Sequence, residues 1–136
     1  MGRRRQAREI ALQALYIADA AHTPCAEAIA SVLRGDSDAD EKTSDFARAL
    51  VEGTLAQRDQ LDAAITAVAE NWVVARMPLV DRNVLRLAAF ELLGSTDTPV
   101  GVVIDEAIEI ARKFSTEDST RFVNGVLDKL KDKRGK

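Results

Sequence analysis

Proline occurs at only three positions in the 136 residues, Pro24, Pro78 and Pro99, and this scarcity leaves long uninterrupted segments between them. Within these segments apolar residues recur at steps of three and four, the spacing of one face of an α-helix, and alternation with period two is rare. The pattern predicts an all-α fold. Because proline cannot continue a helix interior, each of the three also indicates a helix boundary.

About seven helices in two small helical subdomains are expected from this pattern. The restart after Pro78 is the best internal boundary, so we expect one domain over 1–136, with an N-terminal half of about 1–77 and a C-terminal half of about 78–136. The expected helices cover about 4–21, 26–33, a helix or kinked pair from a cap at Thr43 or Ser44 to about 72, 81–93, 99–114, and a last helix from a cap at Ser115 or Thr116 to about 130.

The composition excludes several classes of protein. With 46% hydrophobic residues the chain can bury one core. One cysteine, Cys25, rules out an internal disulfide framework, and with one histidine, His22, it leaves too few soft ligands for a zinc site. No apolar run approaches the roughly 20 residues that span a bilayer. We expect a soluble, unprocessed cytoplasmic protein without metal or cofactor.

No catalytic constellation is present in the sequence. His22 and Cys25 could form a base and thiol pair, but both lie in or beside a short link between helices, and structural roles are favoured. The carboxylates at 105, 106 and 109 are followed one turn later by Arg112 and Lys113, which is typical of a solvated, ion-paired helix face. We therefore expect no enzymatic activity.

The chain is acidic as a whole, with a formal charge of −3, yet both ends are basic. Residues 2–8 contain four arginines and no acid, residues 129–136 contain five cations and one acid, and 36–45 form an acidic loop. Arg4 and Arg8 are spaced i and i+4, and Arg5 and Arg8 i and i+3, so they share a helical surface that can follow phosphates. A solubilising tail is the alternative.

Aromatic residues amount to only 4% of the chain, which argues against a stacking sheet or an OB-fold and favours a helical binder of nucleic-acid backbone. Tyr16, at the edge of a polar helix face, suits either the core or a partner contact. Phe122 lies on an apolar stripe, so core packing is its default role. Asn124 and Gly125 interrupt that stripe and indicate a close helix–helix approach. A DNA-binding helix-turn-helix is disfavoured because 26–33 offers few base-reading side chains.

Four segments together resemble the bacterial transcription antitermination factor NusB family. They are RRQAREIALQALY at 4–16, VDRNVLRLAAFEL at 80–92, PVGVVIDEAIEIARKF at 99–114 and RFVNGVLD at 121–128. The four occur in the family's order and span nearly the whole chain, so their combination is far more specific than any one of them. The resemblance implies an all-α fold of two helical subdomains.

The resemblance also implies a function. It implies binding to boxA RNA of ribosomal RNA leader transcripts, together with NusE, the ribosomal small-subunit protein that doubles as a transcription factor, within the RNA polymerase antitermination complex that contains other Nus factors. By resemblance, the RNA contacts fall on Arg4, Arg5, Arg8, Asp118 and Phe122, and the NusE contacts on Tyr16 and Asp81. Many family members carry Glu where Asp81 stands, so the side chain that makes this contact is expected to reach less far.

Two alternatives remain open at this stage. The chain could be an RNA-targeting module, or an oligomerising helical module whose arginines serve solubility, without an antitermination role. A homodimer that masks the RNA-binding face is equally open.

Overall fold

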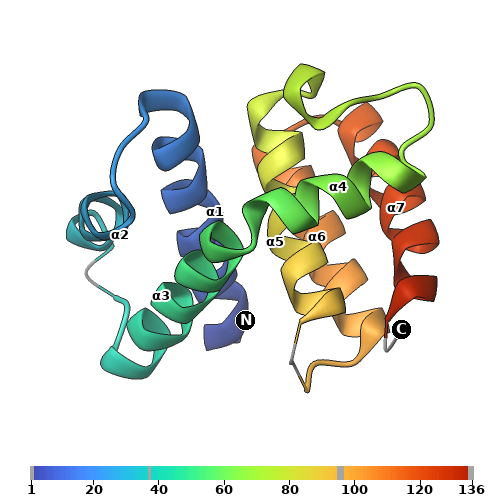
Figure 1. Ribbon diagram of the computed structural model, residues 1–136. Helices are drawn as coiled ribbons and strands as arrows, with labels where there is room; N and C mark the ends of the chain where they lie inside the picture. Colours follow the sequence, from blue (N-terminus) through green and yellow to red (C-terminus); the bar gives the residue numbers. More distant parts are fainter. Residues whose placement is uncertain (1, 37, 95–96, 135–136) are drawn as a thin grey trace. The chain divides into compact units, whose positions relative to one another are not determined.

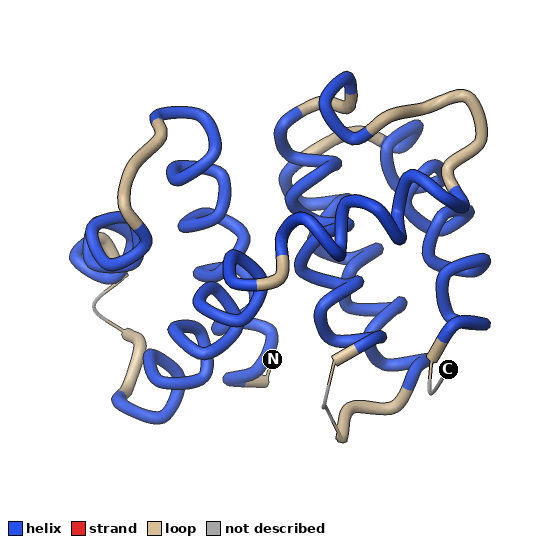
Figure 2. Tube along the Cα trace, viewed as in Figure 1, coloured by secondary structure: helices blue, strands red, loops and turns tan. Residues whose placement is uncertain are grey.

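The computed structural model describes residues 2–36, 38–94 and 97–134, which form seven α-helices and two short 3₁₀ turns without any strand (Figures 1 and 2). The predicted all-α class and the number of helices are confirmed. Contacts divide the chain into two compact units, Met1–Ala56 and Gln57–Lys136. This division differs from the one expected near residue 77, because α4 (Arg58–Val68) packs against α5 and α7 and so belongs to the second unit.

The first unit is a bundle of three helices, α1 (Arg3–Ala21), α2 (Cys25–Arg34) and α3 (Glu41–Ala56), each of which contacts the other two. The buried side of α1 follows helical spacing, with Ala7, Ile10 and Ala14 inaccessible or nearly so. Ala7 and Ile10 pack with Ala47 of α3, and a ring of half-buried residues surrounds them: Val32, Leu33, Ala39 and Phe46. The arginine cluster therefore lies on the first two turns of a helix that the core holds in place.

The start of α3 differs from the sequence prediction. The cap is neither Thr43 nor Ser44 but Asp40, whose carboxylate accepts the backbone N–H of Thr43 at 2.8 Å. The long helical stretch is two helices, and the chain turns at Gln57 between α3 and α4. Asp40 belongs to an acidic run that the sequence analysis interpreted as a loop. In the structure its carboxylate instead accepts a backbone N–H at the start of α3.

The second unit is built around α5 (Leu79–Leu93), which contacts α4, α6 (Val100–Phe114) and α7 (Glu117–Leu130). Two 3₁₀ turns, η1 (Val74–Arg76) and η2 (Lys131–Lys133), complete it. Ten of the fifteen residues of α5 are buried, which is what a central helix requires. The largest enclosed side chains in this unit belong to all four helices: Ile65, Leu85, Leu92, Ile110, Leu127 and Leu130.

The helix ends in this unit test two further expectations. Thr116 caps α7 as predicted, since its hydroxyl accepts the N–H of Ser119 at 3.1 Å. The close helix approach inferred at Gly125 is wrong: Gly125 is exposed, and a Cβ there would meet no atom within 4 Å. Packing of α7 therefore does not explain this glycine.

An ion pair joins two helices of the second unit. Arg86 of α5 donates from Nε and from a terminal nitrogen to the two carboxylate oxygens of Asp62 of α4, at 2.7 and 2.9 Å. Asn83 accepts a further bond from the same guanidinium at 3.3 Å. Because the Arg86 side chain is only 9% exposed, this two-pronged pair fixes α4 on α5.

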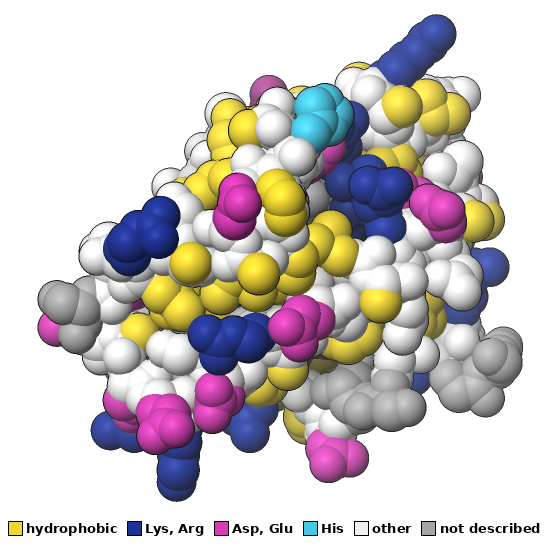
Figure 3. Space-filling model, turned by 60° about the vertical axis from the view of Figure 1, so that its left-hand side comes forward, with side chains coloured by type: hydrophobic (Ala, Val, Ile, Leu, Met, Phe, Trp, Pro, Cys, Tyr) yellow, Lys and Arg dark blue, Asp and Glu magenta, His cyan; other side chains and the backbone are white. Residues whose placement is uncertain are grey.

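Both apolar and charged side chains reach the surface. Figure 3 shows one face, on which hydrophobic side chains gather between scattered basic and acidic ones. Among the described residues, the large hydrophobic ones that are exposed are Tyr16, Trp72, Val73 and Val102. None of the helices described is long and apolar enough to cross a membrane.

Candidate RNA interface

The N-terminal arginines differ in how far they reach solvent. Arg3 and Arg4 are exposed, Arg5 is half-buried, and Arg8 is only 3% exposed. The spacing that places Arg4 and Arg8 on one helical surface is present, since all four belong to α1. Of the three arginines predicted to bind RNA, Arg4 presents its charge most openly, and Arg8 lies beneath the surface.

An aromatic ring of α3 organises two of these arginines. The guanidinium carbon of Arg4 lies over the Phe46 ring, 4.5 Å from its centroid, and that of Arg8 lies 5.8 Å from the same centroid. Both distances fall within the range of cation–π attraction. Phe46 therefore holds Arg4 against α3 while leaving its charge accessible.

Arg3 has a different neighbour. It forms an ion pair with Asp40, the residue that caps α3. The backbone N–H of Thr43 lowers the pKa of Asp40 most, and Arg3 contributes, so the carboxylate stays ionised. The buried Thr43 hydroxyl also lowers this pKa.

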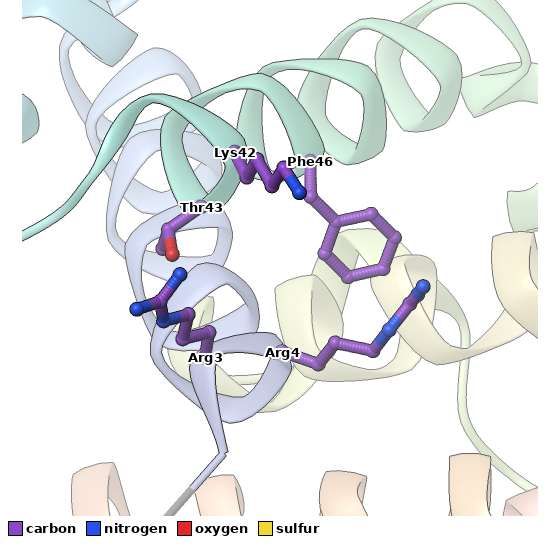
Figure 4. A pocket seen from close by; sticks show the side chains of 5 residues that line it. All are labelled: Arg3, Arg4, Lys42, Thr43 and Phe46. Atoms are coloured by element: carbon purple, nitrogen blue, oxygen red, sulfur yellow. The ribbon is translucent and has the colours of Figure 1, made fainter.

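These side chains surround an open hollow of about 220 Å³. Figure 4 shows Arg3 and Arg4 reaching into it from α1, and Lys42, Thr43 and Phe46 from α3. None of the three α3 residues was predicted to bind RNA, and Thr43 was expected only as a possible helix cap. The spacing of Lys42 and Phe46, i and i+4, was the available signal, because it places a cation and an aromatic ring on one face of α3.

The second unit carries the other two residues predicted to bind RNA. Asp118 is fully exposed at the start of α7 and pairs with Arg121. Phe122 is half-buried and meets Trp72 edge to face, with ring centroids 5.9 Å apart at 60°. Trp72 is 46% exposed and was not assigned a role from the sequence. The pair presents aromatic surface beside a polar helix start, which suits contact with a base.

The two residues predicted to bind the protein partner lie in contrasting positions. Tyr16 is 40% exposed on α1, as a contact residue requires. Asp81 is 4% exposed, and its two oxygens accept hydrogen bonds from the hydroxyls of Ser115, at 3.0 Å, and Ser119, at 2.9 Å. The carboxylate of Asp81 thus ties the start of α5 to the start of α7.

The structure gives no support to thiol catalysis. His22 is exposed and ends α1 in a left-handed conformation, with φ of 52°. Cys25 begins α2, and burial, with the negative charge of Glu52, raises the pKa of its thiol and so disfavours the reactive thiolate. Among the described residues no cluster of three or more His, Cys, Asp or Glu could hold a metal ion.

Comparison with known proteins gives a consistent result. The profile of the NusB family matches residues 5–132. The transcription antitermination protein NusB of Elusimicrobium minutum is 47% identical over 135 residues, covering 98% of this chain and 96% of that protein. Among solved structures, T. maritima NusB aligns with a TM-score of 0.89 at 36% identity, covering 98% of this chain and 93% of the other. A crystal structure of antitermination factors NusB and NusE in complex with double-stranded RNA aligns with a TM-score of 0.89 at 25% identity, covering 96% of both chains.

Proposed function

Because the chain belongs to the NusB family, we propose that it binds boxA RNA of ribosomal RNA leader transcripts together with NusE and suppresses termination by RNA polymerase. Its family role is transcription antitermination, which is regulatory and not enzymatic. The observation that carries the proposal is the family match over residues 5–132, which includes Arg5 and Arg8 of α1. The solved complex of NusB, NusE and RNA supports the choice of partners.

The proposed mechanism begins with electrostatic attraction. Exposed Arg4 and half-buried Arg5 of α1 would contact phosphates, and Arg8 would act from beneath the surface through the Phe46 ring. Phe122 with Trp72, and Asp118 with Arg121, would add contacts from the second unit. We propose that the two units work as a single RNA-binding domain. Few base contacts and few phosphate contacts predict weak binding by the protein alone.

Tyr16 and Asp81 are proposed to serve the NusE surface in different ways. Tyr16 would contact the partner directly, because its ring is exposed. Asp81 is enclosed, so its contribution would pass through Ser115 and Ser119, which it holds in place. Completion of the basic surface by NusE would then tighten the RNA complex.

The wider setting is proposed from the same family membership. The RNA-bound pair would act on RNA polymerase with other Nus factors, in the cytoplasm. A homodimer that covers the RNA-binding face would compete with this assembly, so the protein's mass in solution should be measured before and after RNA is added.

The deciding experiment measures binding of a labelled boxA-like RNA and a scrambled control by fluorescence anisotropy, with and without purified NusE, across salt concentrations. We expect a preference for boxA that grows when NusE is present. Salt-sensitive binding that ignores both sequence and NusE would leave an RNA-targeting helical module, and the absence of any RNA binding would leave an oligomerising one.

A further inference from the structure

We propose that Asp81 is a positioning residue for RNA recognition, because its carboxylate fixes the first turn of α7, from which Asp118 and Phe122 are proposed to meet RNA. The inference rests on the proposed function and deepens it. It gives Asp81 a role that does not require NusE, in addition to the partner role proposed above. The residues that carry it are called the Asp81 network below: Asp81, Ser115, Thr116 and Ser119.

Asp81 is an enclosed acid without a counter-charge. It is 4% exposed in the first turn of α5, and among the described residues no cation pairs with it. Burying a carboxylate in this way costs free energy, and hydrogen bonds from neutral groups offset that cost only in part. An apolar residue of similar size would pack there at lower cost, so stability alone does not account for the charge. A role in positioning α7 accounts for it.

The hydroxyl groups that bond to Asp81 come from both sides of the link between α6 and α7. Ser115 follows the last residue of α6 and donates to one Asp81 oxygen at 3.0 Å. Ser119, in the first turn of α7, donates to the other oxygen at 2.9 Å, and the two serine oxygens lie 2.8 Å apart. The hydroxyl of Thr116, which caps α7, lies 3.2 Å from that of Ser119. One carboxylate therefore joins the end of α6 to the beginning of α7.

The two residues of α7 proposed to meet RNA are attached to the Asp81 network through one turn of helix. Asp118 directly precedes Ser119, and Phe122 follows it by three residues, so fixing Ser119 fixes both. Asp118 and Phe122 are spaced i and i+4 and therefore share one face of α7, whereas Ser119 is buried. A helix held at its first turn presents this face in one orientation, so less entropy is lost when RNA binds.

Trp72 reports on this face of α7. It is the only tryptophan of the chain, and its ring meets that of Phe122 with centroids 5.9 Å apart. If α7 shifts when the Asp81 network is cut, this contact loosens and water reaches more of the indole, which moves its emission to longer wavelength. The signal requires neither RNA nor NusE. A loss of stability that leaves the native structure unchanged would not produce it.

The experiment uses two matched pairs of variants of the full chain. Asp81→Ala removes the carboxylate, and its control, Asn83→Ala, removes another buried polar group of α5, one that bonds to two residues of its own helix. Ser119→Ala removes a hydroxyl of the Asp81 network, and its control, Thr120→Val, removes the next hydroxyl of α7, which bonds within that helix. Trp72 emission is measured first, followed by the anisotropy of labelled boxA-like RNA at low salt, with and without NusE.

We expect Asp81→Ala to weaken RNA binding about fivefold, the lower range for loss of a base–aromatic contact, and by the same factor with and without NusE. The direction is informative, because removing a negative charge near RNA would by itself tighten binding. Ser119→Ala should weaken binding about threefold, since it removes one of the two hydroxyls. Both variants should move Trp72 emission to longer wavelength, whereas Asn83→Ala and Thr120→Val should behave as the unaltered protein does.

Other results would overturn the inference. If the losses appear only when NusE is present, Asp81 serves the partner surface alone and the proposed function stands. If each variant matches its control in Trp72 emission and in RNA binding, the Asp81 network does not position α7. If Asp81→Ala does not fold, Ser119→Ala, which retains the carboxylate, decides between these results. If the unaltered protein binds no RNA in either condition, the proposed function fails, and this inference fails with it.

Discussion

The two basic ends of the chain carry similar charge in the sequence but use it differently in the fold. At the C-terminal end Lys129 pairs with Glu70 at 3.0 Å and Lys131 with Asp128 at 2.7 Å. Arg134 donates to the backbone carbonyls of Thr98, at 2.7 Å, and Glu91, at 3.3 Å. These cations are bonded to their own unit.

At the N-terminal end the balance is different. Arg3 pairs with Asp40, whereas the guanidinium of Arg4 lies over the Phe46 ring and forms no ion pair with any described residue. They lie beside an open hollow that also receives Lys42. The comparison teaches that a cluster of cations indicates a ligand only where the fold does not already supply the anions.

The largest expected effect comes from removing three charges at the N-terminal end, with removal of three at the C-terminal end as the comparison. Replacing Arg4, Arg5 and Arg8 by alanine should lower the salt slope of RNA binding by about two units, or by about 1.4 if buried Arg8 only positions Phe46. Replacing Lys129, Lys131 and Arg134 should leave the slope unchanged. Anisotropy across salt concentrations measures both, with circular dichroism to verify the fold. Equal losses at the two ends would mean that only the overall field attracts RNA.

A smaller effect is expected for stability, and here the C-terminal end should lose more than the N-terminal end. Arg134→Ala should lower the free energy of unfolding by about 1.5 kcal/mol, because two carbonyl groups lose a charged donor. Arg4→Ala should cost only about 0.5 kcal/mol, the value of an exposed cation–π contact. Urea denaturation measures both, and Lys133→Ala, an exposed cation at the same end as Arg134, is the control. A larger loss for Arg4 than for Arg134 would reverse the comparison.

Substitution of Gly125 tests whether α7, the helix before the C-terminal end, contacts RNA. Gly125→Ala should stabilise the protein by up to about 1 kcal/mol, since alanine favours a helix and its Cβ meets nothing. Gly101→Ala, also exposed and open on α6, is the control. Thermal unfolding measures the gain. If Gly125→Ala also weakens RNA binding while Gly101→Ala does not, RNA approaches the backbone of α7 one turn after Phe122.

The features that could be predicted from the sequence are the local ones. Helix limits follow from the spacing of apolar residues and from caps such as Thr116, which act within a few residues. The Asp40 cap was missed because an acidic run resembled a solvated loop. Burial of Asp81 was missed because its partners, Ser115 and Ser119, lie more than thirty residues away in the sequence. Contacts across such distances leave no periodic signal.

The candidate site divides in the same way. The arginines of α1 were identified because they are adjacent and share one helix face. The contributions of Lys42 and Thr43 could not be, since they depend on α3 packing against α1. Trp72 was missed for a similar reason: its contact with Phe122 joins the loop after α4 to α7. Each missed residue lies where two segments meet.

The smallest effect concerns Asp40, the acid that pairs with an arginine, Arg3, at the N-terminal end. Asp40→Asn should leave α3 capped at neutral pH, because asparagine caps a helix about as well as aspartate. It should also tighten RNA binding, because the charge of Arg3 is no longer paired with Asp40 and can attract a phosphate. Anisotropy at low salt measures the gain, and Asp45→Asn, farther along α3 and paired with Arg48, is the control.

Acid tests the contribution of the ionised Asp40 carboxylate to stability. The pKa of Asp40 is lowered from 3.8, chiefly by the Thr43 N–H, so the folded protein binds this proton less readily than the unfolded chain does. The stability that Asp40 contributes is therefore full above about pH 4 and is lost as the pH falls through the lowered pKa. Asp40→Asn has no such proton to bind. Urea denaturation at a series of pH values should show the variant gaining relative to the unaltered protein below pH 4, and parallel curves would mean that the carboxylate does not cap α3 in solution.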